Sequence, residues 1–146
     1  MTALRNRSNK LRTIGRREYV GLTDLSAVHI EAKVDTGAFR TALHCITCRL
    51  IEKDGKQVLE AVFDLDGLGE RTYYFDDYVQ RQVRSSFGEV EQRYCIRTTI
   101  KMGRRKIRSE VSLTDRSDMR YQVLIGRRTL NKRFKVDVSR KYVLRG

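Results

Sequence analysis

The chain has 146 residues, of which 40% are hydrophobic and 34% charged, a composition typical of folded globular proteins rather than of disordered ones. No apolar run approaches the roughly 18 residues that a membrane span requires, so we expect no insertion into a membrane. The formal net charge of +13 favours polyanionic partners, namely nucleic acid, the ribosome or an acidic peptide, over cationic ones.

The N-terminal region is basic. Its first 17 residues carry six lysine or arginine side chains and no acid, and they lack the apolar stretch of a secretory signal. The three cysteines of the chain are too few, and odd in number, for a disulfide framework, which agrees with a reducing compartment. We therefore expect a cytoplasmic protein in which residues 1–12 are a disordered basic segment and residues 13–146 form one domain.

Short segments with a β-type pattern recur along the chain, and long helical periodicity is scarce. One or two helical turns are expected at residues 127–132. The sequence thus predicts an all-β fold with one short helix. The main strands are expected at residues 19–22, 28–34, 57–63, 71–75, 80–84, 89–93, 94–102, 106–113, 121–125, 134–138 and 141–144.

Three turns join these segments into predicted β-hairpins. The first is Asp54-Gly55, a dipeptide preferred in two-residue hairpin turns, which would pair residues 57–63 with residues 50–51. The second is the small tip Ser85-Ser86-Phe87-Gly88. The third is Gly103-Arg104-Arg105, which follows the expected strand at 94–102.

The segment 32–38 holds the first candidate for chemistry. A β-branched strand runs into Asp35-Thr36-Gly37, which places a carboxylate at the start of a tight loop. Thr36 can stiffen this loop through local hydrogen bonds, and Gly37 lets the backbone turn sharply and approach a ligand. A catalytic carboxylate needs such a position. An ordinary aspartate at a strand-to-turn junction has the same pattern, and the triplet alone favours that ordinary reading.

A second motif changes this balance. Val123-Leu124-Ile125-Gly126-Arg127 is an apolar run that ends in glycine before the predicted helical turns. Together with Asp35-Thr36-Gly37-Ala38 it resembles the retropepsin family of dimeric aspartic proteases. The resemblance implies an acid-protease barrel in which this motif packs behind the Asp35 loop and a hairpin flap, here tipped by residues 85–88, covers the substrate. The hairpins between residues 50 and 78 are interpreted as an insertion.

Five blocks in order carry a closer resemblance that covers nearly the whole chain. They are residues 14–20, 34–38, 42–44, 113–119 and 125–128. Together they are similar to the RimB family, which belongs to the retropepsin-like group and is associated with the ribosomal-protein glutamate ligase RimK. Members are often named ATP-dependent zinc proteases.

The resemblance implies an aspartic-type endopeptidase with Asp35, Thr36 and Gly37 as its catalytic loop. Aspartic catalysis uses two carboxylates that share one proton, so that one activates water and the other polarises the carbonyl. This chain has one Asp-Thr-Gly triplet. We therefore expect a homodimer in which Asp35 of each protomer meets on the two-fold axis, with the N-terminal strand and residues 134–144 as the seam.

The resemblance also implies the substrate and the residues that bind it. The association with a glutamate ligase implies an acidic, glutamate-tailed protein linked to ribosomal protein modification. The charge favours such a substrate independently, because a cleft flanked by Arg127, Arg128 and residues 101–108 would concentrate acidic peptides. The expected substrate-binding residues are Ala38, Ser85, Ser86, Phe87, Gly88, Arg127 and Arg128.

One departure from the retropepsin pattern concerns Phe39. Retropepsins usually have an aspartate at this position, paired with the arginine that follows the glycine of the second motif. Arg127 is therefore expected to find another partner, such as an acid elsewhere in the chain.

The clustered His44, Cys45 and Cys48 invite comparison with zinc sites. Structural zinc normally needs four ligands, and in a strand over residues 42–50 the two cysteines would point to opposite faces. We expect no metal and, because no phosphate-binding loop is present, no nucleotide or other cofactor. Two alternatives stay open: a non-catalytic module that docks on the ribosome or RNA through its basic surface, and a zinc-dependent protease.

Overall fold

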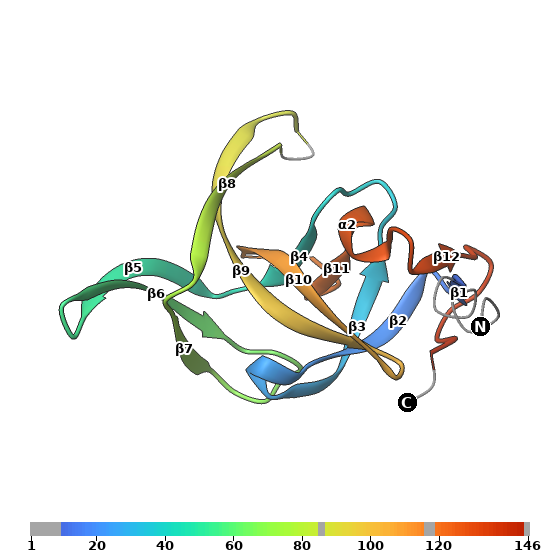
Figure 1. Ribbon diagram of the computed structural model, residues 1–146, viewed down its shortest axis with the longest axis horizontal. Helices are drawn as coiled ribbons and strands as arrows, with labels where there is room; N and C mark the ends of the chain where they lie inside the picture. Colours follow the sequence, from blue (N-terminus) through green and yellow to red (C-terminus); the bar gives the residue numbers. More distant parts are fainter. Residues whose placement is uncertain (1–9, 85–86, 116–118, 145–146) are drawn as a thin grey trace, which may run out of the picture.

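Twelve β-strands make up most of the residues that the computed structural model describes, 10–84, 87–115 and 119–144 (Figure 1). The predicted all-β class is confirmed. A short 3-10 turn, η1 (Thr23–Leu25), and one helix, α2 (Arg127–Leu130), complete the secondary structure of the described residues. The strands are β1 (Arg12–Ile14), β2 (Arg17–Leu22), β3 (Ala27–Val34), β4 (Thr41–His44), β5 (Thr47–Lys53), β6 (Lys56–Phe63), β7 (Arg71–Phe75), β8 (Tyr78–Arg84), β9 (Val90–Met102), β10 (Arg105–Thr114), β11 (Val123–Ile125) and β12 (Phe134–Val136).

Two of the predictions fall wholly or mostly outside the described residues. Most of the segment expected to be disordered, residues 1–9, lies there, although Arg12 already begins β1. Ser85 and Ser86 of the expected flap tip also lie outside. No helix in the described part of the chain is long and apolar enough to cross a membrane.

Six strands close into a barrel. They are hydrogen-bonded in the order β10, β4, β11, β3, β2 and β9, and β9 pairs back with β10. Alternating side chains of these strands fill the barrel, as in β3, where Ile30, Ala32 and Val34 are at most 7% exposed. The alternation at residues 28–34 is the pattern from which this strand was predicted.

The short strand β11 lies between β3 and β4. It runs parallel to β3, with Ile125 opposite Val34, and antiparallel to β4, with Val123 opposite Leu43. The sequence analysis missed β4. All four of its residues are buried, so it lacks the apolar–polar alternation that marks a strand with one solvated face.

The predicted flap hairpin is present. Strand β8 pairs with β9 from Tyr78 opposite Ile96 to Arg84 opposite Val90, and the hairpin projects from the barrel (Figure 1). The separate strands predicted at 89–93 and 94–102 are wrong, because they form the single strand β9. One long strand serves both hairpins, since its first half pairs with β8 and its second half with β10.

A second, three-stranded sheet of order β5-β6-β7 extends from the barrel as the interpreted insertion. The predicted turn joins β5 to β6, with Asp54 at φ +53° and Gly55 at φ +77°. Positive φ at both central residues is the requirement of the tight hairpin turn for which this dipeptide is preferred. Phe63 of β6 is 2% exposed and joins this sheet to the core of the barrel.

The buried carboxylate of Glu18 fastens the two ends of the described chain together. It is 0% exposed and accepts hydrogen bonds from the backbone N–H groups of Gly15 (2.7 Å), Val143 (3.0 Å) and Leu144 (2.9 Å). The strand predicted at 141–144 is wrong: Tyr142 donates its N–H to the carbonyl of Arg17 on β2 at 2.9 Å, but the next two N–H groups, of Val143 and Leu144, bind the Glu18 side chain instead of a neighbouring strand. Nearby, β1 pairs in parallel with β12 of the same protomer.

We expect Glu18→Gln to destabilise the fold by about 2–3 kcal/mol, because the amide NH₂ must face at least one buried N–H donor and leave it unsatisfied. Urea unfolding followed by circular dichroism measures this loss. Glu52→Gln, on the exposed end of β5, is the control and should change stability by less than about 0.5 kcal/mol. Equal stability of the two variants would show that the Glu18 carboxylate does not hold the termini.

Candidate active site

Asp35 directly follows β3 and is held by the neighbouring strand. Its N–H donates to the carbonyl of Ile125 at 2.9 Å, which continues the parallel β3–β11 ladder by one residue. One carboxylate oxygen, Oδ1, accepts the N–H of Gly37 at 2.9 Å, and the carbonyl accepts the N–H of Ala38 at 3.2 Å. The half-buried carboxylate is thus fixed by its own loop, as the Asp-Thr-Gly pattern predicts.

Gly126 presses against the back of this loop. A Cβ atom there would lie 2.5 Å from the carbonyl carbon and oxygen of Arg40 and 2.9 Å from the oxygen of Phe39, so only glycine fits. The next two N–H groups hold the loop: Arg127 donates to the carbonyl of Ala38 (2.8 Å) and Arg128 to that of Phe39 (3.0 Å). The second motif therefore lies behind the Asp35 loop, as the retropepsin resemblance implies.

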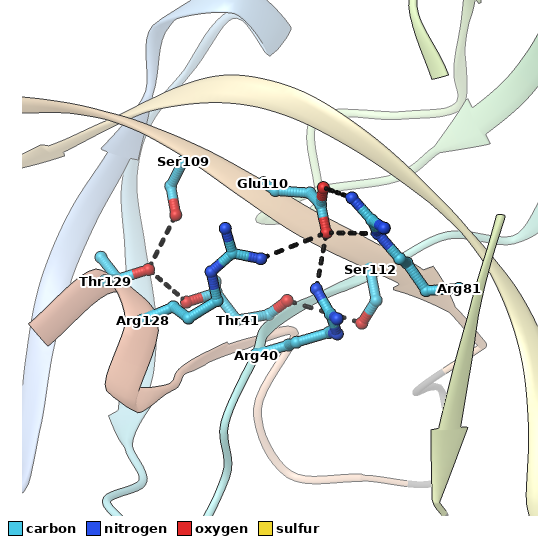
Figure 2. A network of polar contacts seen from close by, with 8 residues as sticks. All are labelled: Arg40, Thr41, Arg81, Ser109, Glu110, Ser112, Arg128 and Thr129. Atoms are coloured by element: carbon cyan, nitrogen blue, oxygen red, sulfur yellow. Dashed lines mark hydrogen bonds and ion pairs between the residues drawn. The ribbon is translucent and has the colours of Figure 1, made fainter. Parts of the chain in front are cut away.

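Three buried hydroxyl groups support this contact from inside the barrel (Figure 2). Thr41 Oγ1 accepts the N–H of Gly126 at 3.1 Å and lies 2.6 Å from Thr129 Oγ1, which lies 2.8 Å from Ser109 Oγ. The sequence analysis missed these three residues. They come from β4, α2 and β10, and no local pattern marks a serine or threonine as part of such a network.

A cavity of about 660 Å³ opens beside Asp35. The flap strands form part of its wall, with Gln82, Val83 and Arg84 from β8, and Ala38 lines the same cavity. Phe87, which is 92% exposed, and Gly88 lie at the flap tip and are not among the residues lining it. The described lining carries one acid, Asp35, and five basic residues, Lys33, Arg40, Arg84, Arg93 and Arg120.

The expected basic flanks of the cleft are therefore misplaced. Residues 101–108 belong to the β9–β10 turn, where Gly103 lies close to Arg12 and Leu144 rather than to Asp35. Arg127 and Arg128 line a separate cavity, also of about 660 Å³, together with Thr36 and Phe39 of the same loop. Lys33 and Arg40 are sequence neighbours of Asp35, whereas the flap hairpin with Arg84 and Arg93 and the loop with Arg120 reach this cavity only through the barrel topology.

Arg127 finds another partner, as expected, and among the described residues this is a backbone carbonyl and an aromatic ring rather than an acid. Its Nη1 donates to the carbonyl of Thr36 at 3.0 Å, and its guanidinium lies 5.8 Å from the ring centre of Phe39. Arg40 and Arg128 also approach this ring, at 5.4 Å and 5.7 Å. The aromatic face that replaces the retropepsin aspartate thus collects three cations by cation–π attraction instead of one by an ion pair.

Cys45 and Cys48 lie closer together than predicted. Strand β4 ends at His44 and β5 begins at Thr47, so the chain turns between the two cysteines and their thiols are hydrogen-bonded to each other. This contact and burial raise the pKa of Cys45, and the same contact lowers the pKa of Cys48. Within the described residues, no group of three or more His, Cys, Asp or Glu side chains is placed to hold a metal ion.

The fold is that of the retropepsin-like acid proteases, because the Asp35 loop rests on the turn before α2 and a hairpin walls the cavity beside it. A family model described as "Retropepsin-like aspartic endopeptidase RimB" matches residues 13–145, and the chain belongs to this RimB-like family. The crystal structure of Lpg0085, a protein of unknown function from Legionella pneumophila, is similar, with a TM-score of 0.76 and 26% identity over 93% of this chain and 100% of that one.

Curated relatives are longer than this chain. A protein of Shewanella halifaxensis is 29% identical over 136 residues, which are 90% of this chain and 29% of the relative. A protein of Parasynechococcus marenigrum is 31% identical over 127 residues, 85% of this chain and 27% of the relative. Both are named "Probable alpha-L-glutamate ligase". The chain thus spans less than a third of the length of these relatives.

We expect Gly126→Ala to displace the Asp35 loop, because a Cβ atom 2.5 Å from backbone atoms forces them apart. Such overpacking costs on the order of 3 kcal/mol, seen as a lower urea midpoint. Gly21→Ala is the matched control: its Cβ would meet its nearest neighbour at an ordinary 3.4 Å, and stability should change by less than about 1 kcal/mol. Similar losses in both variants would contradict the close approach at Gly126.

Proposed function

We propose that the protein is an aspartic-type endopeptidase that works as a homodimer on an acidic, glutamate-tailed protein. The observation that carries the proposal is the cavity beside Asp35, whose described lining holds this one carboxylate and five cationic side chains. A carboxylate fixed by its own loop suits proton transfer, and the surrounding cations suit an acidic chain. The RimB-like family is named for aspartic endopeptidases, which supports the reaction class.

The reaction requires a second carboxylate. Within the described lining of the cavity Asp35 is the one acid, so the partner carboxylate has to come from a second copy of the chain. Thr36 and Gly37 are exposed beside Asp35, which leaves the loop accessible to that copy. In the dimer one Asp35 takes a proton from water, whose oxygen attacks the peptide carbonyl carbon. The other donates a proton to the carbonyl oxygen, and the C–N bond then breaks as the amine is protonated.

The names of the longer relatives support the substrate. A region similar to this chain occurs within proteins named alpha-L-glutamate ligases. A ligase that attaches glutamate and a hydrolase that removes it act on the same acidic chain. Arginine recognises carboxylates through charge-assisted, often bidentate hydrogen bonds, so Arg40, Arg84, Arg93 and Arg120 suit successive glutamate side chains. A link to ribosomal proteins is part of this proposal.

Asp35→Asn should lower the rate of peptide cleavage by at least about 10³-fold while fold and dimer stay intact, because the amide cannot exchange the proton. Mass spectrometry of cleaved glutamate-tailed peptide measures the rate. Light scattering at micromolar concentration should give twice the 17.1 kDa chain mass for wild type and variant. Wild-type activity in the variant, or an active protein that stays monomeric, would contradict a mechanism that uses one Asp35 carboxylate from each protomer.

Poly-glutamate peptides should be cut faster than neutral or basic ones at low salt, with the advantage falling steeply toward 1 M salt, where the Debye length is about 3 Å. Removing two cations from the cavity wall in Arg84→Gln/Arg120→Gln should lower kcat/KM for acidic peptides by roughly tenfold.

The matched control for this test is Arg104→Gln/Lys106→Gln, which removes the same charge from the distant β9–β10 turn and should change kcat/KM less than twofold. Equal turnover of acidic and basic peptides at low salt would show that the charge serves another purpose. Docking on the ribosome or RNA would then be the better explanation.

A further inference from the structure

One carboxylate, that of Glu110 on β10, gathers three arginines (Figure 2). The shortest nitrogen–oxygen distances are 2.6 Å to Arg40, 2.9 Å to Arg81 and 3.7 Å to Arg128. The Glu110 side chain is 12% exposed, less than those of the three arginines at 22%, 43% and 46%. The hydrogen bond from Arg81 and the nearby positive charges hold the pKa of Glu110 below its usual range, so it is ionised at neutral pH.

The three arginines come from three different parts of the proposed site. Arg81 lies on the flap strand β8, which occupies the edge of its sheet and pairs only with β9. Arg40 follows the Asp35 loop and lines the cavity beside Asp35. Arg128 belongs to α2, whose N–H holds the same loop through the carbonyl of Phe39. Glu110 therefore joins the flap, the cavity wall and the support of the Asp35 loop through one side chain.

The charges in this cluster do not cancel. One carboxylate faces three guanidinium groups, which leaves an excess of two positive charges in the cluster, and Arg40 is the member that lines the cavity beside Asp35. The Phe39 ring lies near two of the cations, Arg40 and Arg128, and attracts them by cation–π interaction. This attraction leaves their positive charge in place. A substrate carboxylate that enters the cavity meets Arg40 as a second anion and competes with Glu110 for it.

We propose that Glu110 is a positioning residue that couples the flap to the substrate cavity and limits how tightly the cavity holds acidic chains. The coupling rests on the proposed peptidase function. Glu110 binds both Arg81 of the flap and Arg40 beside the Asp35 loop. It therefore holds the flap in a fixed position relative to this loop during turnover. It also neutralises part of the charge that would otherwise hold substrate and product, which speeds release of an acidic product.

Glu110→Gln tests the proposal, because it keeps the shape of the side chain and removes its charge. KM for a glutamate peptide should fall about threefold to tenfold, since the freed arginines bind substrate carboxylates. The kcat should fall about tenfold, since the flap loses its anchor and product leaves slowly. Hydrogen exchange of the β8 amides should accelerate at least tenfold, a readout that does not depend on catalysis.

Glu60→Gln is the matched control. Glu60 pairs with Arg49 at 3.0 Å on the insertion sheet, and its side chain is 16% exposed, close to the value for Glu110. This variant should change neither kinetic constant nor β8 exchange by more than twofold. Two variants that each remove one arginine separate the two contacts of Glu110. Arg81→Gln should accelerate hydrogen exchange of the β8 amides and lower kcat without lowering KM. Arg40→Gln should raise KM for acidic peptides.

Unchanged β8 exchange in Glu110→Gln, or a KM for acidic peptides that rises, would overturn the coupling. The Arg81 side chain is more exposed than that of Glu110, so Arg81→Gln should fold. This variant still tests the coupling if Glu110→Gln unfolds. If the wild-type protein cleaves no peptide, the proposed peptidase function fails on its own. Hydrogen exchange, and calorimetric binding of uncleaved glutamate peptide to Asp35→Asn with and without Glu110→Gln, then still decide the role of Glu110.

Discussion

The seating of the Asp35 loop on Gly126 is the contact on which the rest of the site depends. The parallel pairing of β3 with β11 brings the two motifs side by side, although 90 positions separate Val34 from Leu124 in the sequence. No side chain fits between Gly126 and the backbone of residues 39–40, and two successive N–H groups after it donate to loop carbonyls. A loop held this closely can keep a carboxylate in one geometry, which general acid–base chemistry requires.

The positive charges near this loop are held by two side chains, Phe39 and Glu110. In a protein with a net charge of +13, the fold places several arginines around the loop, where their mutual repulsion opposes folding. The Phe39 ring lies near three of them, and Glu110 forms ion pairs with three, of which Arg40 and Arg128 are common to both groups. The retropepsin aspartate, if present at position 39, would neutralise this positive wall. Phenylalanine holds the cations and leaves their charge available to an acidic ligand.

Local sequence signals predicted the parts of the structure that local physics determines. The Asp54-Gly55 turn, the flap hairpin and the turn of helix after Gly126 follow from the conformational preferences of a few residues. The Asp35 and Gly126 motifs were recognised as a pair through their resemblance to the retropepsins, because the Asp-Thr-Gly triplet alone favoured an ordinary aspartate. The missed features are set by contacts between distant segments. Glu18 captures residues 143–144 and so removes a predicted strand, and the cavity gathers cations from five separate segments.

The second cavity bears on how two protomers would meet. It is separate from the cavity beside Asp35, and Thr36 of the Asp35 loop is part of its wall. Any two-fold arrangement that brings two Asp35 carboxylates together also brings the adjacent Thr36 residues together, and so places this cavity at or beside the seam. Its wall includes the exposed apolar side chains of Leu11 and Phe39, 36% and 52% exposed, with Phe134 of β12. Since β1 and β12 already pair within one protomer, the proposed dimer would bury this wall, including its cations Arg127, Arg128 and Lys132, rather than exchange terminal strands.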